Sequence, residues 1–227
     1  MHFNVHIDFT RNGLPEFPPA RQREARTEVV RFLISPSSAS MILTTSLTAN
    51  DLVNDGMVER YLELVPPKAA VIPEFQTIIN EIERAYVLGM FFSAVSASCV
   101  SIERMLNLAR IELNIHHPKK MKKLWGKGPS NEWYENIDAL EAWGYLDRDF
   151  AAELASLYKD VRCQYLHSGE IRDLPADALR SARAAYRVID MFLGFHEQLF
   201  RFTDGRIQCL DETDPRFVAF YKKHQQP

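Results

Sequence analysis

The 227-residue sequence contains few cysteines, and this scarcity excludes several classes of protein. Cys99, Cys163 and Cys209 are odd in number and far apart, so a disulfide framework is not expected. They form no CxxC pair, and the sequence contains no HExxH motif, so it offers no ligand pattern for a structural zinc site. We therefore expect no metal and no other cofactor.

The sequence also lacks long apolar runs and a strong excess of one charge. No apolar run reaches the roughly 18 residues that a membrane span needs. The N-terminal segment MHFNVHIDFTRNG lacks the basic region and apolar block of a signal peptide. We therefore expect a cytoplasmic protein without a membrane partner. Because the net charge is −3, any contact with nucleic acid has to come from a local basic patch.

The first third of the chain mixes strand and helix patterns. Residues 2–9 alternate strictly between polar and apolar side chains, which is the period of a half-buried strand. After a proline-rich link, the sequence predicts a helix over Ala20–Leu33, a second strand over Ser40–Thr48 and a short helix over Asp51–Leu64. We therefore expect a small mixed α+β extension over residues 1–72, and its patterns indicate no function.

From residue 73 onward the pattern becomes helical, and five helices are expected. They are Glu74–Leu88, Phe91–Leu113, Asn131–Trp143, a fourth that follows the N-cap residue Asp147, and a fifth that begins at Pro175. The last two carry apolar stripes at a spacing of three and four, namely Phe150, Leu154, Leu157, Val161 and Tyr165, and then Leu179, Ala182, Tyr186, Ile189 and Leu193. The expected fold is thus mainly α. A four- to five-helix bundle spans residues 73–203, and a C-terminal tail over 204–227 contains a strand-like IQCL segment and a last helical piece over Arg216–His224.

Two residues near the end of the fourth helix are suited to chemistry. Arg162 and His167 enclose the segment Cys-Gln-Tyr-Leu, and a glycine follows at position 169. With Phe150 at zero on a helical wheel, Arg162 falls near 120° and His167 near 260°, on flanks that face away from the apolar stripe. One straight helix does not aim both side chains at one point. We therefore expect a composite site in which two copies of this helix meet in a homodimer.

This R-x4-H motif, at the end of a bundle's penultimate long helix and followed by a glycine and a final helix, resembles the HEPN superfamily (higher eukaryotes and prokaryotes nucleotide-binding). The surrounding order is similar too. A short helix runs into Gly89, and the next helix is rich in small residues and carries Ile102-Glu103-Arg104 in the manner of that family's second helix. The resemblance covers residues 74–201 and leaves the N-terminal extension outside.

The resemblance implies a metal-independent ribonuclease that acts on RNA as a homodimer, often in phage defence or a toxin–antitoxin system with a cognate antitoxin or defence-system partner. Arg162 would clamp phosphate oxygens, and His167 would exchange protons with the ribose 2′-OH and the leaving 5′-oxygen. Glu103 and Gln164 would support them. Family members usually carry a polar residue, often asparagine, directly after the arginine. Because Cys163 stands there, a non-catalytic module that binds RNA, nucleotide or protein remains the alternative.

A basic loop between the second and third helices is the candidate RNA-binding segment. It carries Lys119, Lys120, Lys122 and Lys123, which can hold an RNA backbone, and Trp125, which can stack on a base. The competing interpretation is a solvated loop whose tryptophan packs back on the bundle.

The motif residues have alternative interpretations as well. Arg162 can be a surface arginine paired with Asp160 or Glu170, and His167 can be a histidine favoured by the helix dipole. Glu103 can be a solvated or interhelical carboxylate. A helical subunit with a purely structural role is the third hypothesis for the function of the chain.

Overall fold

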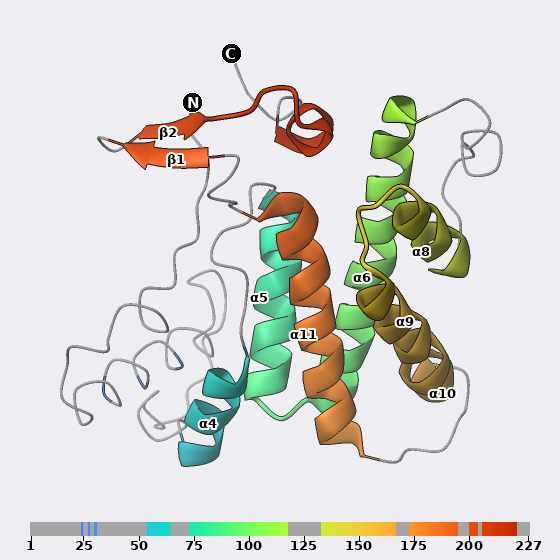
Figure 1. Cartoon of the computed structure of the whole chain (residues 1–227). Coiled ribbons are helices and arrows are strands. Elements are labelled where there is room, and N and C mark those ends of the chain that lie inside the picture. Colours follow the sequence, from blue (N-terminus) through green and yellow to red (C-terminus); the bar gives the residue numbers. More distant parts are fainter. Residues whose placement is uncertain are drawn as a thin grey trace.

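The computed structural model describes residues 54–64, 73–117, 133–166, 173–194, 200–203 and 206–221, together with Glu24, Thr27 and Val30. These residues are mostly helical, so the mainly α architecture is confirmed (Figure 1). The helical elements are α4 (Asp55–Glu63), α5 (Pro73–Val87), α6 (Phe91–Leu113), η1 (Asn114–His116), α8 (Trp133–Ala142), α9 (Arg148–Leu157), η2 (Tyr158–Arg162), α10 (Cys163–Leu166), α11 (Leu174–Leu193) and η3 (Phe217–Tyr221). The strands β1 (Phe200–Thr203) and β2 (Arg206–Cys209) form an antiparallel pair.

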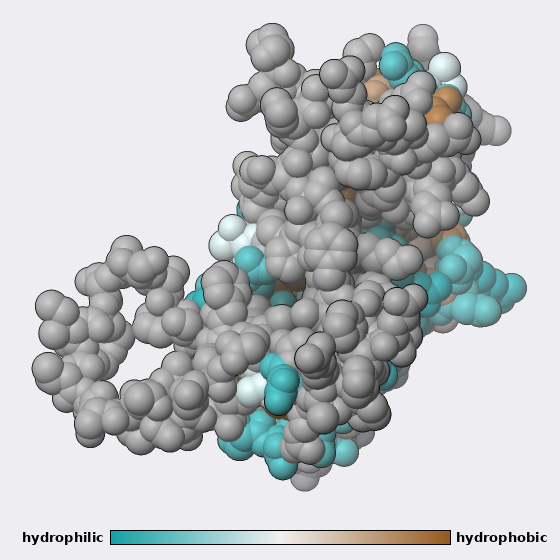
Figure 2. Space-filling model, turned by 90° about the vertical axis from the view of Figure 1, so that its left-hand side faces the viewer, coloured by the Kyte–Doolittle hydropathy of each residue, from teal (hydrophilic) through white to brown (hydrophobic). Residues whose placement is uncertain are grey.

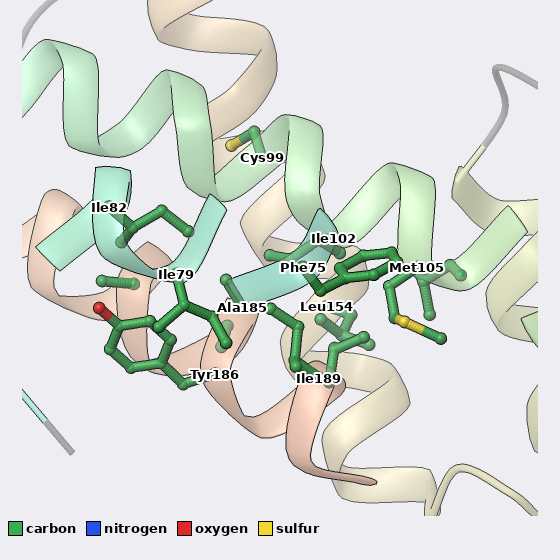
Figure 3. Close-up of a cluster of buried hydrophobic side chains, with 14 of the residues drawn as sticks. Phe75, Ile79, Ile82, Cys99, Ile102, Met105, Leu154, Ala185, Tyr186 and Ile189 are labelled. Carbon is green, nitrogen blue, oxygen red and sulfur yellow. The ribbon is translucent and has the colours of Figure 1, made fainter. Parts of the chain in front are cut away.

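Helix α6 is the centre of the bundle. It packs against α5 and α11 on one side and against α8 and η2 on another (Figure 1). The small residues Ala94, Ser98 and Ser101 are fully buried, and small side chains let neighbouring helices approach closely. Figure 3 shows how the core is filled, with Phe75 and Ile79 from α5 lying near side chains of α6, α9 and α11. The described residues on one face of the molecule are mainly hydrophilic, with a few small hydrophobic patches (Figure 2).

Local sequence signals place the helix ends where they were expected. The bounds of α6 agree with the prediction of Phe91–Leu113 at both ends. Gly89 and Gly144 follow α5 and α8 with φ angles of 75° and 80°, a left-handed conformation that glycine adopts without strain. Asp147 caps α9, because its side chain accepts a hydrogen bond of 2.8 Å from the backbone N–H of Phe150. The expected apolar stripes of the fourth and fifth helices are buried or, at Leu179, partly buried.

The fourth helix departs from the prediction at Tyr158. Its last part is not a continuous α-helix: residues Tyr158–Arg162 form a π-helix, and α10 resumes at Cys163. The π turn contains one residue more than an α-helical turn. Beyond it, a helical wheel drawn at 100° per residue therefore places each side chain about 100° too far around the helix axis. The prediction that Arg162 faces away from the core is therefore wrong. This side chain is only 18% exposed and lies against α6.

Helix α4 shares the core of the bundle although it precedes the expected boundary at residue 72. Its Tyr61 is fully buried. Arg60 donates a hydrogen bond of 2.9 Å from Nε to the carbonyl of Val87, and the hydroxyl of Tyr86 donates one of 2.7 Å to Glu63. These contacts join α4 to the end of α5, so α4 is packed as part of the bundle.

Most of the N-terminal extension lies outside the described residues, including the two expected strands, residues 2–9 and Ser40–Thr48. Within the expected helix Ala20–Leu33, the three described positions are helical, and Val30 is fully buried.

The C-terminal tail forms a hairpin and a short helix. The expected strand-like segment is β2, which pairs with β1 so that Phe200 is opposite Cys209. The expected last helix is present as η3, a π-helix. Its Phe220 is 1% exposed, and its ring centroid lies 6.1 Å from that of Phe192 on α11. The tail therefore packs on the end of the bundle. No helix among the described residues is long and apolar enough to cross a membrane.

We expect the N-cap of α9 to contribute measurably to stability. The change Asp147→Ala removes the acceptor for the N–H of Phe150 and is expected to lower the free energy of unfolding by about 1 kcal/mol, measured by urea denaturation. The matched change Asp147→Asn keeps the capping oxygen and removes only the charge that pairs with Arg187, so its effect should be smaller. Equal losses for both variants would show that the exposed ion pair, and not the cap, matters here.

Candidate functional site

The carboxylate of Glu103 on α6 joins three elements of the bundle. Its Oε2 atom accepts a hydrogen bond of 2.9 Å from Nη2 of Arg162, at the end of η2. The same oxygen accepts one of 3.2 Å from the indole N–H of Trp133, at the start of α8. The side chains of Arg162 and Glu103 are 18% and 22% exposed, so this ion pair is mostly shielded from water. A single carboxylate therefore links α8 and η2 to α6.

Two aromatic rings complete the surroundings of Arg162. The central carbon of its guanidinium group lies 5.3 Å from the ring centroid of Tyr158 and 6.0 Å from that of Trp133. A cation within about 6 Å of an aromatic ring is attracted by the electrons of its face. Because Trp133 is fully buried and its N–H is bonded to Glu103, this ring is fixed in place. The guanidinium group is thus held between a carboxylate and two aromatic rings.

A second polar contact fixes α8 on α6. Arg110 lies seven residues, or two turns, after Glu103 and therefore on the same face of α6. It is 1% exposed, and its Nε donates a hydrogen bond of 2.6 Å to Oδ1 of Asn136. Burial lowers the pKa of Arg110, and the nearby charge of Glu135 opposes this effect. The polar face of α6 thus holds both ends of the first turn of α8 and keeps Trp133 in position.

Tyr134 and Tyr158 form the outer edge of the cluster. Their ring centroids lie 5.2 Å apart in an edge-to-face arrangement, at 71°. Tyr158 is half-buried, whereas Tyr134 is 43% exposed. Burial raises the pKa of Tyr158, with a further contribution from Cys163, so the phenol stays neutral through the physiological pH range. The cluster therefore leads from a shielded ion pair to an exposed aromatic ring.

Two cysteines lie beside the cluster. Cys99 on α6 is fully buried, and burial raises the pKa of its thiol to about 12, although the positive charge of Arg162 opposes this effect. Cys163, directly after the arginine, is half-buried, and both thiols are free. A thiol is a weak hydrogen-bond donor, and that of Cys163 forms a side-chain hydrogen bond with Tyr158.

The structure brings some of the predicted site residues together. Arg162 and Glu103 form the ion pair described above, whereas Asp160 accepts a hydrogen bond from Ser156 and is not the partner of Arg162. Gln164 is half-buried, and its side chain makes no hydrogen bond within the described residues. The other candidates lie outside the part of the chain that the structure describes: His167, Lys119, Lys120, Lys122, Lys123 and Trp125.

The aromatic residues of the site were not predicted from the sequence. A signal for Tyr158 was available, because it stands four residues before Arg162, and residues four apart on a helix are neighbours. Trp133 and Tyr134 carry no such signal, since they belong to a helix that is brought to Arg162 only by the packing of the bundle. The rings of Trp133 and Tyr158 are the ones that lie against the arginine.

His117, which follows η1, has a structural role. Its ring stacks on Trp143 with centroids 4.4 Å apart and also meets the ring of Tyr145 edge-on. Among the described residues, no group of three or more His, Cys, Asp or Glu side chains is arranged to hold a metal ion. Comparison of the chain with protein-family models, with curated proteins and with solved structures gives no match.

The two cysteines near the site should differ strongly in reactivity. With a pKa of about 12, only about one Cys99 thiol in ten thousand is ionised at pH 8, so iodoacetamide should label Cys163 well before Cys99. The folded-state pKa of Cys99 lies above the ordinary value of 9.0, so between pH 9 and 12 the unfolded chain loses the thiol proton while the folded chain keeps it. The contribution of this thiol to stability should therefore be constant below pH 9 and fall as the pH rises from 9 toward 12. Peptide mapping by mass spectrometry, with guanidinium-unfolded protein as the control, measures the labelling; rapid labelling of native Cys99 would contradict its burial.

The ion pair between Arg162 and Glu103 should show coupling in a double-mutant cycle. We expect an interaction energy of about 0.5–1 kcal/mol from Arg162→Met, Glu103→Gln and the double variant, because both side chains keep some contact with water. Glu103→Gln keeps an oxygen that accepts from Trp133, so it removes the charge with little change in shape. Strictly additive losses in urea denaturation would mean that the pair contributes no coupling.

Proposed function

We propose that this chain is a metal-independent ribonuclease of the HEPN type, which acts as a homodimer with Arg162 and His167 as catalytic residues. The observation that supports this best is the fixed position of the arginine. Its guanidinium group is held by Glu103, Tyr158 and Trp133 at the end of the helical segment that carries the R-x4-H motif.

The held arginine is suited to bind a phosphate group. A guanidinium group has five N–H donors in a rigid plane, and Glu103 is its single hydrogen-bond acceptor within the described residues. The remaining donors can bind two oxygens of one phosphate. Because the carboxylate offsets part of the positive charge, recognition depends on the geometry of hydrogen bonding more than on long-range attraction. This agrees with a net charge of −3 for the whole chain.

The proposed reaction needs no metal. One histidine takes the proton of the ribose 2′-OH, the 2′-oxygen attacks the phosphorus, and the bond to the 5′-oxygen breaks as that oxygen receives a proton from a second histidine. The products are a 2′,3′-cyclic phosphate and a 5′-hydroxyl end. Arg162 stabilises the crowded anionic transition state. In this proposal His167 of each subunit supplies one proton-transfer group, and Lys119, Lys120, Lys122, Lys123 and Trp125 hold the RNA backbone.

A non-catalytic module that binds RNA, nucleotide or protein is the second candidate, and a specific observation favours it. Cys163 occupies the position next to the arginine where a polar residue is usual, and the arginine is already paired with a carboxylate. Such a module would bind without turnover. Antiviral defence and toxin–antitoxin systems are the settings that either candidate fits, with a cognate antitoxin or defence-system protein as a further partner.

Substitution of the motif residues tests the ribonuclease. Arg162→Ala and His167→Ala should each lower the rate of RNA cleavage in EDTA by about 100-fold or more, since each removes a group that acts in the transition state. End-labelled RNA on a denaturing gel gives the rate and the chemistry of the new ends. Circular dichroism and analytical ultracentrifugation check that helicity and dimerisation are retained.

Arg187→Ala is the matched control. Arg187 also pairs with carboxylates and lies over an aromatic ring, 3.8 Å from the centroid of Phe150, but on α11 outside the cluster. Cleavage should be unchanged in this variant. If the native protein cuts no RNA in EDTA but binds it, the binding module replaces the ribonuclease. If it neither cuts nor binds RNA, both readings that involve RNA fail.

A further inference from the structure

One aromatic ring of the Arg162 cluster faces solvent and has no role in holding the arginine. Tyr134 is 43% exposed, and the only aromatic ring that its own ring contacts within the described residues is that of Tyr158. The contact is edge-to-face, with the two ring planes at 71°. Such a contact uses one side of a ring and leaves the rest of its surface for another flat group.

The backbone that carries this ring is held in place. Tyr134 follows Trp133, which is fully buried and bonded to Glu103, and the end of the same turn of α8 is fixed by the contact between Arg110 and Asn136. An exposed ring on a fixed backbone loses little conformational freedom when it binds a ligand. Exposure of a large ring at such a position is therefore typical of a binding surface.

The position of Tyr158 links the exposed ring to the phosphate-binding arginine. Its centroid lies 5.2 Å from that of Tyr134 and 5.3 Å from the guanidinium carbon of Arg162. The centroid of the Tyr134 ring and the guanidinium carbon are thus at most 10.5 Å apart, which is about three nucleotides at a stacked spacing of roughly 3.4 Å. An exposed ring beside a group that binds phosphate fits a nucleotide chain, in which flat bases alternate with phosphates.

We propose that Tyr134, backed by Tyr158, is a stacking subsite for an unpaired nucleobase, placed within about three nucleotides of the phosphate that Arg162 binds. This inference rests on the proposed function in that its ligand is RNA, but it requires only binding and not cleavage. Stacking on a tyrosine is tolerant of base identity, because every base has an aromatic face. The subsite therefore selects single-stranded over double-stranded RNA, whose bases are already stacked.

The test measures binding of a probe that cannot be cleaved. A fluorescein-labelled 12-nucleotide 2′-O-methyl oligouridylate has no free 2′-OH, and a blunt 2′-O-methyl RNA duplex of the same length is the comparison. Tyr134→Ala should weaken binding of the single strand by about 10-fold, whereas Tyr134→Phe should retain it within about twofold. Affinity for the duplex should not change. The salt dependence should also stay the same, because stacking releases no counterions.

Phe92→Ala is the matched control. Phe92 is an exposed aromatic residue on α6, 48% exposed, that lies outside the cluster, so its loss should leave binding unchanged. Equal affinity of the native protein and Tyr134→Ala for the single strand would overturn the subsite. A change in oligomeric state of Tyr134→Ala in analytical ultracentrifugation would also overturn it, since the ring would then be a contact between copies of the chain.

Kinetics separate this inference from the proposed ribonuclease. If the enzyme is active, Tyr134→Ala should raise KM for single-stranded RNA by about 10-fold and leave kcat unchanged, because the ring binds substrate away from the reacting atoms. Active enzyme with unchanged KM and Kd in this variant overturns the subsite and leaves the ribonuclease standing. Binding that depends on Tyr134 in a protein that cleaves nothing supports the subsite and overturns the ribonuclease.

Discussion

The structure around the candidate site depends on one carboxylate that accepts two hydrogen bonds. Oε2 of Glu103 receives the N–H of Trp133 and an N–H of Arg162, which come from two different elements. A buried indole N–H without an acceptor costs free energy, and so does a shielded carboxylate without a donor. Because the carboxylate accepts a hydrogen bond from both the indole and the guanidinium group, none of the three polar groups lacks a partner. Helix α8 and the π-helix η2 are thereby held against α6.

This arrangement contributes more to orientation than to stability. A partly exposed ion pair stabilises a fold by only about 0–1 kcal/mol, whereas the apolar side chains buried between α5, α6 and α11 contribute far more in total. The carboxylate instead fixes where the guanidinium group of Arg162 lies and which rings it touches. Catalysis and ligand binding both require such fixed geometry, because a group that must first be ordered loses part of its effect.

The π-helix is the feature that makes the contact possible. In a regular α-helix, Arg162 would lie about 100° to one side of the apolar stripe marked by Phe150 and Leu154. The extra residue in the turn from Tyr158 to Arg162 rotates the arginine back toward α6. Single π turns inside helices are frequent at functional sites, since they redirect one side chain while the helix continues on either side.

The features that depend on near neighbours in the chain could be predicted from the amino-acid sequence. The bounds of α6, the cap at Asp147 and the buried stripe of the fourth helix all follow from residues a few positions apart, so periodicity and capping rules predicted them. The pairing of Glu103 with Arg162, 59 residues away, was one of several interpretations that the sequence allowed. The folded structure selects this pair, because the partner of a charged side chain depends on which helices pack together. The π turn before the arginine leaves no periodic signal in the sequence.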